Sequence, residues 1–126
     1  MDCFFGSYEI GVDPDDNIKA VVTFSIPDVG IKFKAPFNGV NPDHCDFASL
    51  LALLEFIDSN QKYFKNHTYS IFGNNRRVIE QVNEKEQAPL SFAPLMAKAR
   101  KYKRKYRFSL EWVPTSQNDA FDDLLN

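Results

Sequence analysis

The last fifteen residues, Trp112 to Asn126, restrict the fold more than any other part of this sequence. The run Trp112-Val113-Pro114 indicates a β-strand that ends at a corner, because proline cannot donate a hydrogen bond to a neighbouring strand. A short helix that carries several Asp side chains is expected next, over residues 117–125. The chain therefore closes with a strand, a corner and an acidic helix.

The rest of the chain predicts a series of strands and then an alternation of helices and strands. Runs rich in Val, Ile, Phe and Tyr, bounded by turn residues, indicate strands over residues 3–10, 18–26, 31–35, 69–73 and 108–113. Apolar patterns indicate helices over residues 45–57, 76–82, 92–106 and 117–125. The first of these helices is apolar almost all the way round, which is typical of a helix buried between a sheet and other elements.

The order of these elements predicts the fold class. Short turns join the first three strands, which must therefore form an antiparallel meander. The last two strands each follow a helix, so we expect them to run parallel to the first strand. The prediction is an α/β fold: a mixed five-stranded sheet flanked by helices. With 126 residues, of which 44% are hydrophobic, the chain can bury one core, so we expect a single domain over residues 1–126.

Composition indicates the cellular location of the protein and the state of its cysteines. No apolar stretch is long enough to span a bilayer, and we expect a soluble, cytoplasmic protein without membrane contact. Two cysteines, Cys3 and Cys45, cannot build a disulfide framework, so we expect free buried thiols. We also expect Trp112 to lie in the core and His44 and His67 to be structural.

Four segments in this order resemble the ribonuclease H-like family. The ending is similar to the family's last strand and helix, where Trp-Val-Pro is followed by Asn and then by a metal-binding Asp. The resemblance extends from about residue 40 to the end and is weaker before that point. The segments that carry it are Phe4-Phe5-Gly6-Ser7, the helix from Cys45 to Glu55, the stretch from Ile71 to Val82, and Trp112 to Asp122.

The resemblance implies a site from which two acids are missing. In the family, four acids hold two magnesium ions; here Asp46 and Asp122 stand at two of those positions, and Phe5 and Asn74 at the other two. Phosphodiester hydrolysis by two metals needs cations about 4 Å apart, held by oxygen ligands. Phe5 offers no ligand and Asn74 only a neutral oxygen. We expect a vestigial site at Asp46 and Asp122, although Glu9 shares the strand face of Phe5 and is an alternative acid.

Basic residues suggest a nucleic-acid surface. The net charge is −2, yet residues 98–107 hold seven of the fifteen Lys and Arg residues. Such segregation can attract phosphates to one face. The alternative is a solvated helix face whose bases favour the helix C-terminus. The predicted nucleic-acid-binding residues are Arg76, Arg77, Lys98, Lys101, Arg104 and Lys105.

Three functions are compatible with these observations. The first is a catalytically degenerate ribonuclease H-like domain that requires no cofactor and is retained for binding RNA/DNA hybrid, duplex nucleic acid or a protein partner. The second is a divergent but active RNA/DNA-hybrid ribonuclease that uses Mg²⁺ or Mn²⁺. The third is a structural or assembly protein. The sequence leaves the oligomeric state open.

Overall fold

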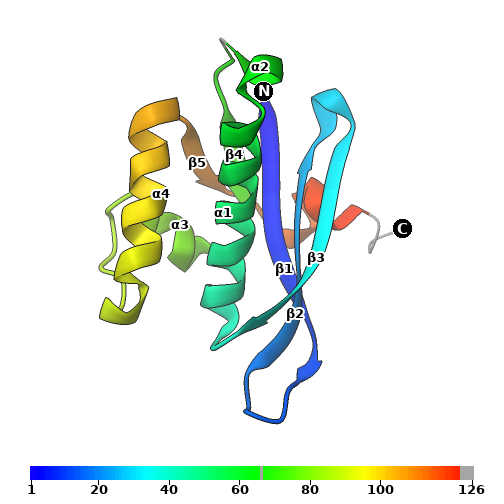
Figure 1. The fold of residues 1–126 in the computed structure, drawn as a ribbon, viewed down its shortest axis with the longest axis vertical. Helices are drawn as coiled ribbons and strands as arrows, with labels where there is room; N and C mark the ends of the chain where they lie inside the picture. Colours follow the sequence, from blue (N-terminus) through cyan, green and yellow to red (C-terminus); the bar gives the residue numbers. More distant parts are fainter. Residues whose placement is uncertain (66, 123–126) are drawn as a thin grey trace.

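The computed structural model describes residues 1–65 and 67–122 and has a five-stranded sheet at its centre (Figure 1). The strands are ordered β3-β2-β1-β4-β5 across the sheet. β2 pairs antiparallel with both β1 and β3, whereas β4 runs parallel to both β1 and β5. This topology confirms the predicted fold class. The strands are β1 (Asp2–Val12), β2 (Ile18–Ile26), β3 (Ile31–Gly39), β4 (Ser70–Gly73) and β5 (Ser109–Trp112).

Helices lie mainly on one face of this sheet. In Figure 1, α1 and α4 stand side by side in front of the strands, and the C-terminal segment lies behind them. That segment contains two short 3-10 turns, Thr115–Gln117 and Asp119–Phe121, and the Thr23 hydroxyl of β2 donates to the Ala120 carbonyl. The α-helices are α1 (Pro42–Ser59), α2 (Gln61–Phe64), α3 (Arg76–Val82) and α4 (Ala93–Tyr106). Within the described residues, no helix is long and apolar enough to cross a membrane.

Helix α1 forms the middle of the core. It begins three residues earlier than predicted, because the Asn41 side chain accepts a hydrogen bond from the His44 backbone N–H and Pro42 takes the first helical position. Its apolar residues, such as Phe47, Leu50 and Leu54, are fully buried between the sheet and the other helices. Cys3 and Cys45 are free and buried, as expected.

Two further expectations differ from the structure. The final helix predicted over residues 117–125 is interrupted at Asn118, which has extended backbone angles. The Asn118 side chain is held there by residues of β1 and of the loop after β4. Residues 123–126 lie outside the described part. The prediction that Trp112 lies in the core is wrong. Its side chain is 41% exposed, because β5 is an edge strand and the C-terminal segment packs against β1 and β2 instead.

Candidate functional site

Phe5, at the position of the first lost acid, is part of the core. It is 1% exposed and lies opposite Gly73 in the parallel pairing of β1 and β4. The ring packs so closely over Gly73 that a Cβ atom there would come within 2.6 Å of it. An aromatic ring therefore fills the space beside the end of β4, and Gly73 is needed because no side chain fits beneath that ring.

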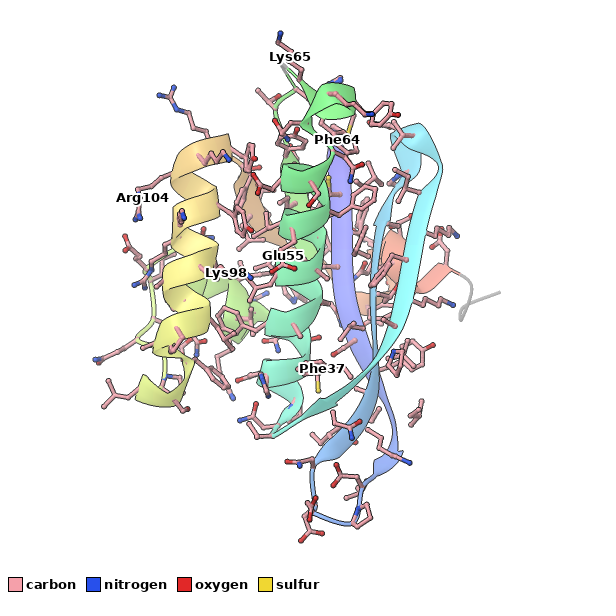
Figure 2. All side chains as sticks on the ribbon, in the orientation of Figure 1. Phe37, Glu55, Phe64, Lys65, Lys98 and Arg104 are labelled. Atoms are coloured by element: carbon pink, nitrogen blue, oxygen red, sulfur yellow. The ribbon has the colours of Figure 1, made fainter. Side chains whose placement is uncertain are left out.

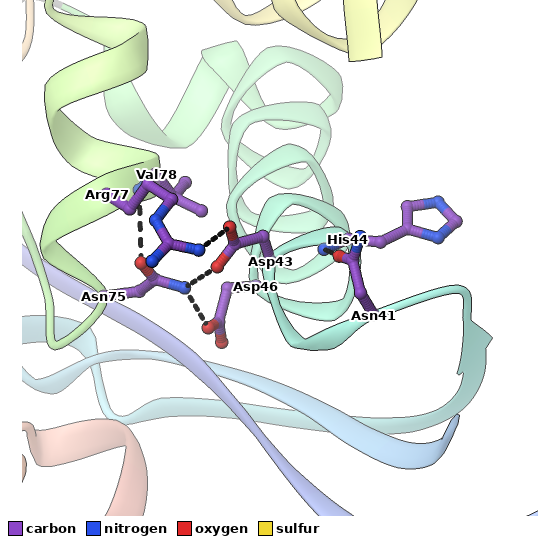
Figure 3. A network of polar contacts seen from close by, with 7 residues as sticks. All are labelled: Asn41, Asp43, His44, Asp46, Asn75, Arg77 and Val78. Carbon is purple, nitrogen blue, oxygen red and sulfur yellow. Dashed lines mark hydrogen bonds and ion pairs between the residues drawn. The ribbon is translucent and has the colours of Figure 1, made fainter. Parts of the chain in front are cut away.

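Asp46 lies in a network of hydrogen bonds between β1, α1 and α3 (Figure 3). The Ser7 hydroxyl donates to Asp46 Oδ1 over 2.6 Å. The Asn75 side-chain amide donates to Asp46 Oδ2 over 2.7 Å and to Asp43 Oδ1 over 2.9 Å. Arg77 pairs with the other oxygen of Asp43 at 3.2 Å. Both oxygens of Asp46 therefore already accept hydrogen bonds from the protein.

The surroundings of Asp46 change its acidity. Burial raises the pKa of this carboxyl group above its ordinary value, and the negative charge of Asp43 adds to the effect. Hydrogen bonds from Ser7 and Asn75 favour the ionised form and lower the pKa, but burial outweighs them. The pKa of Asp46 is thus raised overall, although both of its oxygens accept hydrogen bonds.

Asn74 faces a different set of partners from its neighbour Asn75. Its side-chain nitrogen donates to Thr115 Oγ1 over 3.1 Å, and its Oδ1 accepts a hydrogen bond from Asn118 at 2.9 Å. Asn118 is fully buried and also donates to the backbone carbonyl of Phe5. Asn74 is therefore bound to the C-terminal segment, whereas Asn75 is bound to α1.

The segment that carries Asp122 lies on the face of β1 opposite Asp46. Phe121, immediately before it, packs over Gly6 so closely that a Cβ atom on Gly6 would lie 2.4 Å from the ring, and it meets Tyr8 edge to face. Gly6 and Tyr8 alternate along β1 with Ser7, whose side chain contacts Asp46. The structure brings Asp46 together with Ser7 and Asn75, whereas Phe121, the residue before Asp122, packs on the other face of the sheet.

The alternative acid Glu9 is exposed near the far end of β1. Its charge contributes to a raised pKa of the Cys45 thiol, after the larger effects of burial and of Asp46. Within residues 1–65 and 67–122, no group of three or more His, Cys, Asp or Glu side chains is arranged to hold a metal ion.

Many of the predicted nucleic-acid-binding bases have partners within the chain. Lys98 pairs with Glu55, and Lys105 pairs with Asp58 at 2.8 Å. Figure 2 shows Lys98 and Glu55 meeting between α4 and α1, while Arg104 extends outward from α4. Three of the six, Arg76, Lys101 and Arg104, are exposed and form no ion pair with any described residue.

Arg76 is held by an aromatic ring rather than by an acid. Its guanidinium lies 4.3 Å from the centroid of the Trp112 ring, and the indole N–H donates to the Asn74 carbonyl over 3.2 Å. These two side chains line one pocket of about 250 Å³ between α3 and β5. An exposed arginine stacked on an exposed tryptophan thus borders the loop that carries Asn74 and Asn75.

Sequence reasoning missed three residues that organise the site: Asp43, Asn75 and Asn118. Asn75 stands directly before the helix predicted over residues 76–82, and this position is the signal that could have identified it as a cap. Its Oδ1 accepts a hydrogen bond from the Val78 backbone N–H over 3.1 Å. Asp43 lies in the first turn of α1, directly after Pro42, whereas nothing in the sequence indicated that the Asn118 side chain would be buried.

Comparisons with known proteins give a likeness in structure alone. No protein-family model matches this sequence, and no curated protein matches it. RNase H1 from the halophilic archaeon Halobacterium salinarum is 16% identical, with a TM-score of 0.72 over 98% of this chain and 92% of that one. An N-terminal RNase H domain from Mycobacterium tuberculosis is 15% identical, with a TM-score of 0.69 over 93% of this chain and 84% of that one.

A third solved structure of similar fold is a complex. LC11-RNase H1, isolated from compost, was solved in complex with an RNA/DNA hybrid and is 12% identical, with a TM-score of 0.74 over 99% of both chains. Together with the strand order and the parallel pairing of β1, β4 and β5, these likenesses show that this chain has a ribonuclease H-like fold.

Proposed function

We propose that this chain is a ribonuclease H-like domain that has lost two-metal hydrolysis and is retained for binding nucleic acid, as RNA/DNA hybrid or duplex. The observation that carries the proposal is the closed hydrogen-bond network around Asp46, in which Ser7 and Asn75 donate to both carboxylate oxygens. Within this network Asp46 is positioned by uncharged donors, and Asp43 is the acid that shares Asn75 with it, whereas two divalent ions need several carboxylates around them.

The residues at the family's four acid positions do not fit a pair of divalent cations. Mg²⁺ needs oxygen ligands in a regular geometry, and two such ions need several carboxylates to offset their charge. Phe5 supplies a buried ring. The Asn74 oxygen is a neutral ligand and already accepts a hydrogen bond from Asn118. The segment before Asp122 packs on the opposite face of β1 from Asp46.

Nucleic-acid binding is supported by the fold and by three exposed bases. One protein of the same fold, LC11-RNase H1, was solved with an RNA/DNA hybrid. In this chain Arg76, Lys101 and Arg104 are exposed and pair with no acid among the described residues. An arginine stacked on an aromatic ring, as Arg76 is on Trp112, is held in place while its N–H groups remain available for phosphate.

Binding can be tested by fluorescence anisotropy with a labelled RNA/DNA hybrid. We expect affinity to fall by roughly a hundredfold between about 50 and about 200 mM salt if a few phosphates are contacted. Replacing Lys101 and Arg104 together by Glu should weaken binding about tenfold or more and reduce the salt slope by about two. The control is Lys98→Gln with Lys105→Gln, which removes two bases already paired with Glu55 and Asp58 and should have a smaller effect.

Cleavage distinguishes the proposal from an active ribonuclease. The same hybrid, incubated with Mg²⁺ or Mn²⁺, should remain intact, and Asp122→Asn should leave binding unchanged. Metal-dependent cleavage of the RNA strand that disappears in Asp122→Asn would establish the alternative, a divergent but active enzyme.

Association with a protein is a second candidate function. Beside the end of α1, Val29 and Tyr63 are 47% and 68% exposed and line an apolar pocket of about 370 Å³ with Phe56 and Phe64. Exposed apolar patches of this kind often mark interaction sites. Analytical ultracentrifugation of the protein and of Tyr63→Glu tests whether the chain self-associates through this surface.

A further inference from the structure

Two carboxylates of helix α1 are joined by a single amide nitrogen. Asp43 and Asp46 are three residues apart on one face of α1, where two negative charges repel each other. The Asn75 Nδ2 atom lies 2.9 Å from Asp43 Oδ1 and 2.7 Å from Asp46 Oδ2, so it donates one hydrogen bond to each group (Figure 3). The amide stands between the carboxylates in the way that a bridging cation would.

The remaining oxygens of the pair also have donors. Asp43 Oδ2 contacts Arg77 Nη1 at 3.2 Å, and Asp46 Oδ1 accepts a hydrogen bond from the Ser7 hydroxyl at 2.6 Å. All four carboxylate oxygens are therefore bound by protein groups, and the Arg77 charge offsets one of the two negative charges. A cation bound here would share these oxygens with donors that already hold the pair in place.

Asn75 couples this pair to the start of α3. Its Oδ1 accepts a hydrogen bond from the Val78 N–H and caps α3, while its Nδ2 holds the first turns of α1. One side chain thus connects the start of α3 to the first turns of α1, through contacts with residues that lie 32 and 29 positions earlier in the sequence.

We propose that Asn75, with Arg77, is a built-in substitute for a bridging cation: the amide bridges Asp43 and Asp46, Arg77 offsets one of their two charges, and together they fix α3 to α1 without metal. The inference rests on the loss of the metal clamp but not on nucleic-acid binding. It also assigns this role to Asn75 rather than to Asn74, the residue that the family resemblance aligns with a lost acid, because Asn74 contacts Thr115 and Asn118 instead.

The test compares Asn75→Asp with Asn74→Asp. In Asn75→Asp one oxygen can still cap α3, but the other replaces the donor and brings a third carboxylate to Asp43 and Asp46. We expect its Tm in EDTA to fall by about 5–10 °C, and Mn²⁺ or Mg²⁺ to restore at least half of that loss by binding the folded state. The wild-type Tm should not respond to either ion.

Asn74→Asp is the matched control, because it makes the same chemical change one residue earlier. Its Oδ1 can still accept from Asn118, so we expect a smaller loss in Tm and no recovery with divalent ions. A divalent-ion response in Asn74→Asp but not in Asn75→Asp would overturn the proposal. So would a wild-type protein that these ions stabilise as strongly as Asn75→Asp.

A double variant keeps the test decisive if Asn75→Asp does not fold. Asp43→Asn combined with Asn75→Asp restores one amide among the carboxylates, and Arg77 can pair with the new acid. We expect this double variant to fold with a Tm within about 3 °C of wild type and without a divalent-ion response. A double variant as unstable as the single one would show that the bridge is not the source of stability. Because the readout is Tm, failure here is distinct from failure to bind nucleic acid.

Discussion

The two ends of helix α1 hold their carboxylates in opposite ways. At the first turns, Asp46 is half-buried and accepts hydrogen bonds from a hydroxyl and an amide, both uncharged. At the last turns, Asp58 pairs with Lys105 and accepts a hydrogen bond from Tyr106. Burial raises the pKa of Asp46, whereas the hydrogen bonds from Lys105 and Tyr106 lower the pKa of Asp58.

The difference shows which polar contacts of α1 stabilise the fold and which can be replaced at little cost in stability. A buried carboxylate without donors is costly, so each donor at the first turns is needed. An exposed ion pair contributes little, since water and salt compete with it. The bases of α4 that pair with the last turns of α1 thus add little to stability, and the pairing also makes them less available to a phosphate backbone.

The largest effect is expected from returning an acid to the site. Phe5→Asp removes a ring that is 1% exposed and places a carboxylate in the core, on the strand face that also carries Ser7. We expect a loss of about 3–5 kcal/mol in the free energy of unfolding, from the cavity and the buried charge together. Urea denaturation measures this loss.

Phe5→Leu separates the two contributions. It keeps an apolar side chain in the same space, and we expect a loss of about 1–2 kcal/mol. If Phe5→Asp were as stable as Phe5→Leu, the space around Phe5 would tolerate a charge. That result would contradict the idea that buried carboxylates in this region need specific donors.

A smaller effect is expected when stability is measured as a function of pH, and its sign should be opposite for Asp46 and Asp58. Because the folded pKa of Asp46 is raised above the ordinary value of 3.8, the folded state binds the proton more tightly, and stability falls as pH rises through the window from 3.8 to the raised value. For Asp58 the folded pKa is lowered, so stability is present above 3.8 and is lost as pH falls through the lowered value.

Each of these two contributions to the pH dependence of stability is removed by one substitution, Asp46→Asn or Asp58→Asn. We expect the stability of wild type relative to Asp46→Asn to decrease with rising pH, and that of wild type relative to Asp58→Asn to increase. Urea unfolding at a series of acidic to neutral pH values measures both differences. Slopes of the same sign for the two variants would contradict the assignment.

The sequence predicted the framework better than the site. The strand over residues 18–26 and the helix over residues 76–82 have the predicted bounds, because turn residues delimit them and their apolar patterns agree with the sheet and the core. Crossovers through helices determined which strands are parallel. These signals are local or follow from connectivity, so a single sequence contains them.

The site depends on which way individual side chains face. Asn74 and Asn75 are adjacent and of one type, yet Asn74 contacts the C-terminal segment and Asn75 contacts α1. Glu55 and Lys98 are far apart in sequence, so their pairing follows only from the packing of α4 on α1. The metal and nucleic-acid roles assigned to Asp46, Asp122 and the bases stay predictions until binding and cleavage are measured.

The smallest effect is expected at the surface pair of Glu55 and Lys98. Their side chains are 49% and 47% exposed, so water competes with the pair. We expect a coupling energy below about 0.5 kcal/mol from a double-mutant cycle with Glu55→Ala and Lys98→Ala. Ser7→Ala at the other end of α1 removes a donor to Asp46, and the expected loss is about 1–2 kcal/mol. A surface pair that contributed more to the free energy of unfolding than this hydroxyl would contradict the comparison. Helix α1 would then be held mainly by its ion pairs with α4, and the uncharged donors to Asp46 would add little to stability.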